Sequence, residues 1–139
     1  MEDPFRLQRF VDAQQSMYEQ ACAELQSGRK QGHWMWFIFP QIRGLGRSQT
    51  SRRFAISSTA EAAAYLRHSV LGPRLRECTR WVLSTEDRSI RQIFGAPDDL
   101  KFHSCMTLFA SVAPEEDPFR VALEKFFDGA PDENTLDRL

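Results

Sequence analysis

Apolar residues recur at helical spacing along most of the chain, and this pattern predicts an all-α fold. Between Phe10 and Leu25 the spacing predicts a helix that starts near Asp3-Pro4 and stops at Gly28. No segment alternates convincingly between apolar and polar residues, so no sheet is predicted. The clearest stripe has the i, i+3, i+4, i+7 spacing of one helix face and consists of Phe102, Cys105, Met106 and Phe109.

Capping residues and prolines divide the rest of the chain into further short helices. Ser48 and Thr59 are expected to cap helices near residues 49–55 and 60–67, and a longer helix is predicted over residues 70–83. Asp98 places negative charge in the first turn of the next helix, which Pro114 is expected to end. Residues 1–139 are therefore predicted to form a single all-α, multihelical domain of about seven to eight helices.

The most apolar stretch runs from His33 to Gln41 and reads HWMWFIFPQ. Periodicity alone allows a strand or a short helix, but a lone strand would have no partner. Residues 29–39 are therefore predicted to form a short, largely buried helix whose last turn is disfavoured by Pro40. The stretch can be a plain core element, or it can form one wall of a pocket for a flat, anionic molecule.

The composition is that of an ordinary globular protein. Hydrophobic residues make up 42% and charged residues 27% of the chain. The longest apolar run, residues 34–39, is far shorter than the ~20 residues that span a bilayer, and no secretory signal is recognised, so no membrane partner is expected. Three widely separated cysteines argue for reduced thiols and a cytoplasmic location.

A net charge of −1 hides an uneven distribution of charged residues. Residues 29–91 carry twelve basic and four acidic side chains, whereas the segments on both sides are acidic. Between Glu24 and Glu61 there is no carboxylate, but there are six basic residues. Such asymmetry indicates either an anion-binding face or a basic middle that packs against acidic ends, and the sequence leaves both open.

The segment after the aromatic run combines features of an anion-binding loop. Gly44 and Gly46 allow the backbone to approach a ligand closely, and the start of a helix at Ser48 offers N–H groups. Arginine adds charge and paired donors that match phosphate. The segment is neither a Walker loop nor a Rossmann fingerprint. The candidate ligand-binding residues in it are Gln41, Arg43, Arg47, Ser48, Ser51 and Arg52.

A second group of candidates lies outside this loop. Lys101 and Ser104 share a helix face with Asp98, and the group is either a solvated ion pair or the polar edge of a cleft. Trp36 is a candidate for stacking on a base, and His33 is expected to line the same cleft.

Several other kinds of chemistry are disfavoured. The histidines are not at metal-ligand spacing with cysteine or carboxylate, so no metal and no cofactor are expected. No GxSxG elbow or other nucleophile–base arrangement is recognised, and no catalytic residue is identified. The absence of a helix-turn-helix or zinc motif argues against a nucleic-acid partner.

The sequence resembles one known family over almost its whole length. The run HWMWFIFPQ, the following Gly44-Leu45-Gly46, and residues 51–56, 61–66, 71–75 and 101–109 are similar to the family catalogued as domain of unknown function 1810. The resemblance implies an all-α, multihelical fold and no established activity. Members are sometimes labelled calpastatin, but calpastatins are disordered inhibitors and this chain does not resemble one. Cys105 stands where the family pattern suggests serine.

Together these features favour binding of a small anionic ligand of nucleotide or ADP-ribose type at a cleft lined by arginine and aromatic side chains. A looser similarity, to the NADAR superfamily of small helical proteins linked to ADP-ribose derivatives, agrees with that ligand class but is carried by no matching motif. Hydrolysis of the ligand is left open. The alternative is an interaction or assembly module that docks through a partly exposed aromatic segment.

Overall fold

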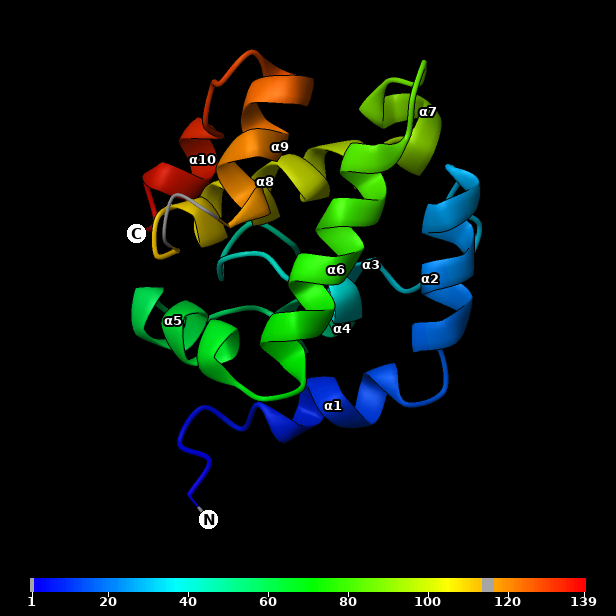
Figure 1. Cartoon of the computed structure of the whole chain (residues 1–139). Helices are drawn as coiled ribbons and strands as arrows, with labels where there is room; N and C mark the ends of the chain where they lie inside the picture. Colours follow the sequence, from blue (N-terminus) through cyan, green and yellow to red (C-terminus); the bar gives the residue numbers. More distant parts are fainter. Residues whose placement is uncertain (1, 114–116) are drawn as a thin grey trace.

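The computed structural model describes residues 2–113 and 117–139, and in this part of the chain all regular elements are helices (Figure 1). The all-α prediction is confirmed, but the described residues form ten helices rather than seven to eight. Six of these have seven residues or more, and the additional ones are short turns of helix. The helices are α1 (Gln8–Gln14), α2 (Tyr18–Ser27), α3 (Met35–Ile38), α4 (Gln49–Arg53), α5 (Thr59–Arg67), α6 (Leu71–Ser84), α7 (Ile90–Phe94), α8 (Asp98–Ala110), α9 (Pro118–Phe127) and α10 (Glu133–Leu136).

The long helix predicted at the N-terminus is divided into α1 and α2. Asp3 is not the N-cap: α1 begins at Gln8 after Leu7, and the Asp3 carboxylate accepts hydrogen bonds from the amides of Leu7 and Gln8 ahead of the helix. The backbone leaves the helical region again at Met17, where φ is −133°. α2 then ends at Gly28, whose φ of 79° is the left-handed conformation that glycine tolerates, as predicted.

The helix predicted over residues 29–39 is mostly a loop, and only α3 is helical. Glu24 holds this loop, because its Oε1 accepts hydrogen bonds from the amides of Gln31 and Gly32 and from Trp34 Nε1, at 2.7–2.9 Å. Burial acts to raise the pKa of Glu24, but these hydrogen bonds outweigh it and lower the pKa to about 2. A carboxylate on α2 therefore gives the loop amides the partners that a helix would have supplied.

The core is built around α6 and α8. In Figure 1 α6 runs through the middle of the molecule, and α8 packs against α5, α7, α9 and α10. The predicted apolar stripe on α8 is confirmed, since all four of its side chains are fully buried. The aromatic segment joins this core: Trp34 and Phe39 are buried, and the Phe39 ring centroid lies 5.2 Å from that of Phe102. Trp36 and Phe37 are half-buried.

The longest helix of the described residues is α6, with 14 residues. Within residues 2–113 and 117–139 no helix combines the length and the apolar character needed to cross a membrane. Pro114, which the sequence predicts as the end of α8, lies outside the described residues.

Candidate functional site

The predicted anion-binding loop is closed at its base by two backbone hydrogen bonds. The Arg43 amide donates to the Ile56 carbonyl, and the Ile56 amide donates to the Gln41 carbonyl, both at 2.8 Å. They form an isolated parallel bridge between Ile42 and Ile56, whose side chains are buried. The loop is therefore anchored in the core at both ends, and the exposed Arg43 is held close to Arg52 at the end of α4.

Close packing inside the loop explains its glycines and serines. A side chain at Gly46 would collide with Ser51, and Gly44, with φ of 99°, packs against the side chain of Arg138. Ser48 caps α4 as predicted: its Oγ accepts from the Ser51 amide at 3.0 Å, and the Ser51 hydroxyl donates to the Ser48 carbonyl at 2.9 Å. These two serines therefore hold the shape of the loop.

Three adjoining hollows surround α4, and together they form what we call the arginine groove. Their volumes are about 700, 320 and 450 Å³. Arg9 and Arg53 line both the first and the second hollow, and Arg43 and Arg52 line both the second and the third. Each hollow falls within the ~300–1,000 Å³ range of small-molecule sites. The lining side chains include Met17, Phe37 and Phe54 in the first hollow, Arg6, Arg9 and Glu61 in the second, and Arg47 and Ser51 in the third.

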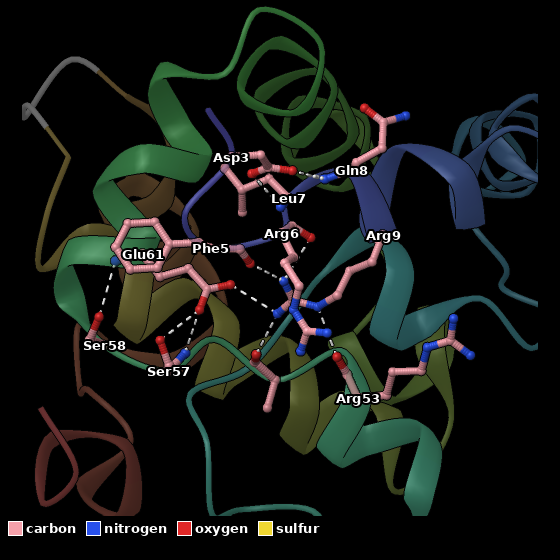
Figure 2. Close-up of polar contacts among 11 residues, drawn as sticks. Asp3, Phe5, Arg6, Leu7, Gln8, Arg9, Arg53, Ser57, Ser58 and Glu61 are labelled. Carbon is pink, nitrogen blue, oxygen red and sulfur yellow. Dashed lines mark hydrogen bonds and ion pairs between the residues drawn. The ribbon is translucent and has the colours of Figure 1, made fainter. Parts of the chain in front are cut away.

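Arg9 is the structural centre of the groove (Figure 2). Its Nη2 lies 2.9 Å from Glu61 Oε2, and the two side chains are only 14% and 3% exposed. The same guanidinium donates to the carbonyls of Arg53 and Ala55 and to carbonyls of the N-terminal segment. Glu61 Oε1 accepts from the amide and the hydroxyl of Ser57. The Arg9–Glu61 pair therefore joins α1, the end of α4 and the start of α5, and it fixes the walls of the groove.

Other arginines of the groove are not engaged in this way. Among the described residues, no hydrogen bond or ion pair joins the guanidinium groups of Arg6, Arg43, Arg47 and Arg52 to another side chain. Arg53 lies over the Phe54 ring, 5.4 Å from its centroid. Because the charge of Glu61 is taken up by Arg9, the groove carries excess positive charge on a concave surface, which attracts anions.

The structure brings Trp36 and Lys101 together, but neither side chain lines the arginine groove. Lys101 Nζ lies 4.2 Å from the centroid of the Trp36 ring and 3.1 Å from Asp98 Oδ1. Asp98 also pairs with Lys30 at 2.7 Å. Burial acts to raise the pKa of Asp98, but hydrogen bonds from Lys30 and Lys101 outweigh it, and the pKa is lowered. The predicted ion pair of Lys101 with Asp98 is present, but it is largely buried rather than solvated, and Lys30 joins it.

The remaining candidates are scattered. Ser104 is buried and donates to the Leu100 carbonyl and to Asp132 Oδ2, each at 3.1 Å, so it fixes α10 to α8. His33 is exposed, and Gln41 is half-buried beside the backbone bridge. Of the predicted site residues, the groove therefore collects Arg43, Arg47, Ser51 and Arg52.

Many groove residues were not among the candidates predicted from the sequence, and they include Arg6, Arg9, Phe37 and Arg53. Phe37 replaces Trp36 as the aromatic wall, with its ring 4.6 Å from that of Phe54 at an angle of 81°. The aromatic run contained the signal for Phe37, but periodicity could not show which ring faces outward. The role of Arg9 in the groove could not be predicted from the sequence, because its partner Glu61 is remote in the chain. In residues 2–113 and 117–139 no group of three or more metal-ligating side chains gathers.

One protein-family model and one solved structure each match almost the whole chain. The model of a family described as "Protein of unknown function (DUF1810)" matches residues 4–139. Among solved structures, the crystal structure of the conserved hypothetical protein Rv1873 from Mycobacterium tuberculosis is similar, with 52% sequence identity and a TM-score of 0.97. That similarity covers 99% of this chain and 98% of the other. A search of curated proteins found no match.

Proposed function

The chain belongs to the DUF1810 family, and we propose that this member binds a small anionic ligand of nucleotide or ADP-ribose type in the arginine groove. The observation that carries the proposal is the continuity of the three hollows through shared arginines. A ligand lying along the groove would meet Arg53, then Arg52 and Arg43, without leaving the concave surface. Guanidinium groups offer paired N–H donors that match phosphate oxygens.

The two ends of the groove differ, which gives the proposed ligand an orientation. The first hollow includes Phe37, Phe54 and Met17 beside polar lining residues, and these three side chains offer a surface for a planar base. The second and third hollows offer Arg43 and Arg52, which suit a phosphate or pyrophosphate. We therefore place the base against Phe37 and the phosphates beside α4.

Hydrolysis of the ligand would need a group that activates water. Glu61 is poorly suited, because Arg9 and Ser57 already occupy its oxygens. Asp12 accepts a hydrogen bond from Gln8 at 2.9 Å and lines only the first hollow, where we place the base rather than the phosphates. Binding is therefore the proposal, and no catalytic residue is assigned.

The alternative, a docking module that uses the aromatic segment, has less support. Trp34, Met35, Ile38 and Phe39 are buried in the core, and Trp36 lies under Lys101. Little aromatic surface is therefore left for a protein partner. A cytoplasmic location remains part of the proposal, and the free thiols of Cys22, Cys78 and Cys105 are consistent with it.

Calorimetric titration with ADP, ADP-ribose, pyrophosphate and adenosine tests the proposal. ADP or ADP-ribose should bind, and adenosine should bind at least about tenfold more weakly because it lacks the charge-assisted contacts. Arg52→Gln and Arg43→Gln should each weaken binding by about tenfold or more. Arg120→Gln, which removes an exposed charge on α9 away from the groove, is the matched control and should bind normally.

A further variant separates the two ends of the groove. Phe37→Ala should weaken binding of ADP but leave binding of pyrophosphate unchanged, because only ADP places a base in the first hollow. If none of the four probes binds, or if Arg52→Gln and Arg120→Gln behave alike, the groove is not an anion site. Circular dichroism and thermal unfolding of each variant confirm that a loss of binding is not a loss of fold.

A further inference from the structure

The outer face of α6 carries a hollow that lies apart from the arginine groove. Figure 1 shows α6 in the foreground, with α2 on one side and α5 and α9 on the other. The hollow has a volume of about 700 Å³, and its lining residues all belong to this one helix: Pro73, Arg76, Glu77, Arg80, Trp81 and Ser84. Each of them is exposed or half-buried. None of the six lines the arginine groove, so this face of α6 is independent of the function proposed above.

These six residues form what we call the α6 stripe, and their spacing is symmetric. Along the chain they are separated by steps of three, one, three, one and three positions, the spacing of one helix face. This series of steps reads the same in both directions, so the stripe is symmetric about the midpoint between Cys78 and Thr79. A second α6 that lies antiparallel on the first, with a two-fold axis through that midpoint, therefore meets the stripe with an identical stripe in register.

The charges of the α6 stripe make it complementary to itself. Glu77 and Arg80 lie at equal distances from the midpoint, so in this arrangement Glu77 of each copy faces Arg80 of the other. Both side chains are exposed, and within the ranges that the structure describes neither forms an ion pair or a side-chain hydrogen bond. The two-fold axis produces two such pairs of opposite charge, which favour this register over others.

Arg76 and Trp81 form the next symmetric pair of the stripe. Contacts within the chain hold the Arg76 guanidinium in place: its Nη2 lies 3.1 Å from Asp117 Oδ2, and its Nη1 donates to the Leu66 carbonyl at 3.2 Å. In the antiparallel arrangement this guanidinium faces the indole ring of Trp81 in the second copy, a favourable contact between a cation and an aromatic ring. Because Arg76 is already held, little side-chain freedom is lost when the contact forms.

We propose that the protein forms a two-fold symmetric homodimer in which the α6 stripe packs antiparallel against the same stripe of a second copy. The ion pairs between Glu77 and Arg80 fix the register, and the other symmetric pairs of the stripe complete the contact. One helix face is a small interface, and interfaces below about 1,200 Å² are typical of transient complexes, so the dimer is weak and reversible. Because its ion pairs lie at the surface, salt weakens it further.

Sedimentation of the full-length protein over a range of concentrations tests whether the dimer exists. At low salt the average mass should rise from that of a monomer near about 1 μM toward that of a dimer near about 300 μM, as expected for a transient interface. Addition of about 1 M sodium chloride should shift the equilibrium back toward the monomer. A monomer at every concentration would mean that the α6 stripe does not bind a second copy, and it would overturn the proposal.

Charge reversal tests whether the dimer uses this face of α6. Glu77→Arg and Arg80→Glu each turn both intermolecular pairs into pairs of like charge, so each should weaken dimerisation by at least about tenfold. Arg91→Glu reverses an exposed charge on α7, outside the α6 stripe, and as the matched control it should dimerise like the natural sequence. If the reversals within the stripe behave like Arg91→Glu, the dimer forms through another surface and the proposal is wrong.

Two rescue experiments test the antiparallel register. The double variant Glu77→Arg/Arg80→Glu restores both pairs with exchanged signs, so it should dimerise like the natural sequence. An equimolar mixture of the two single variants should also associate, because one copy is then basic and the other acidic at both positions. Misfolded chains would not rescue each other in this way, and circular dichroism checks the fold of each variant. Failure of either rescue would exclude the register and overturn the proposal.

Discussion

Replacing Glu61 by glutamine should destabilise the protein more than any exposed charge neutralisation. The substitution keeps the size of the side chain but removes the charge that faces Arg9 at 2.9 Å. The new amide also presents N–H donors toward a guanidinium that has only donors. The amide oxygen of the glutamine takes the position of Glu61 Oε1 and continues to accept hydrogen bonds from Ser57.

The size of the expected loss in stability follows from the burial of the Arg9–Glu61 ion pair. Removing one partner of a buried ion pair costs about 3–5 kcal/mol, because the other charge is left uncompensated. Here Arg9 keeps the carbonyls of Arg53 and Ala55 and those of the N-terminal segment as acceptors, which solvate part of its charge. The expected loss is therefore at the lower end, about 3 kcal/mol, a large share of the ~5–15 kcal/mol that stabilises a typical domain.

Urea unfolding of a double-mutant cycle measures this effect. Arg9→Met alone should also destabilise, since it leaves Glu61 buried with only Ser57 as a partner. The Arg9→Met/Glu61→Gln variant should lose less than the sum of the single losses, with a coupling of about 2 kcal/mol. Glu86→Gln, on an exposed turn, is the control and should change stability by less than about 0.5 kcal/mol.

Two results would refute the reasoning. A loss below about 1 kcal/mol for Glu61→Gln would mean that the pair is solvated in solution and does not hold the groove together. Additive losses in the cycle, within about 0.5 kcal/mol, would mean that Arg9 and Glu61 act separately. Either result would also remove the reason to regard the groove as preformed.

Two further predictions concern the loops on either side of the aromatic segment. Glu24 has a pKa lowered to about 2, so its contribution to stability is present above its ordinary value near 4.5 and is lost as the pH falls toward 2; Glu24→Gln should remove that part of the acid dependence when urea midpoints are compared between pH 5 and pH 2. Gly46→Ala should lower stability by about 1–3 kcal/mol because the new methyl group meets Ser51. Adding Ser51→Gly should restore much of the loss, and equal melting temperatures for Gly46→Ala and the natural sequence would contradict the packing argument.

The parts of the fold that could be predicted are those set by local chemistry. Gly28 ends α2, Asp98 opens α8, and Ser48 caps α4, because each acts on residues within one helical turn. Gln14 illustrates an intermediate case. A buried amide needs hydrogen-bond partners, and Gln14 donates to the Phe37 carbonyl in α3 at 2.7 Å. The partner itself could not be predicted, because it comes from a distant segment.

The errors arise where a distant side chain replaces helical hydrogen bonds. In the loop over residues 29–34 the Glu24 carboxylate accepts from the amides of Gln31 and Gly32, and hydrophobic periodicity contains no information about that contact. The same reason explains the incomplete site. The loop arginines Arg43 and Arg52 were found from local composition, whereas Arg9 enters the groove only when α1 packs beside α4.

Of the two interpretations of the uneven charge distribution, the structure shows packing of basic against acidic segments for some side chains, and an anion-binding face is our proposal for others. Lys30 pairs with Asp98, and Arg76 pairs with Asp117, so part of the basic middle does pack against the acidic C-terminal segment. These pairs are partly or largely buried, and they join elements of the fold. The arginines of the loop after the aromatic segment are exposed instead, and acidic residues of the described chain do not neutralise them. The exposed arginines around α4 are therefore the charges available to the anion that we propose to bind in the arginine groove.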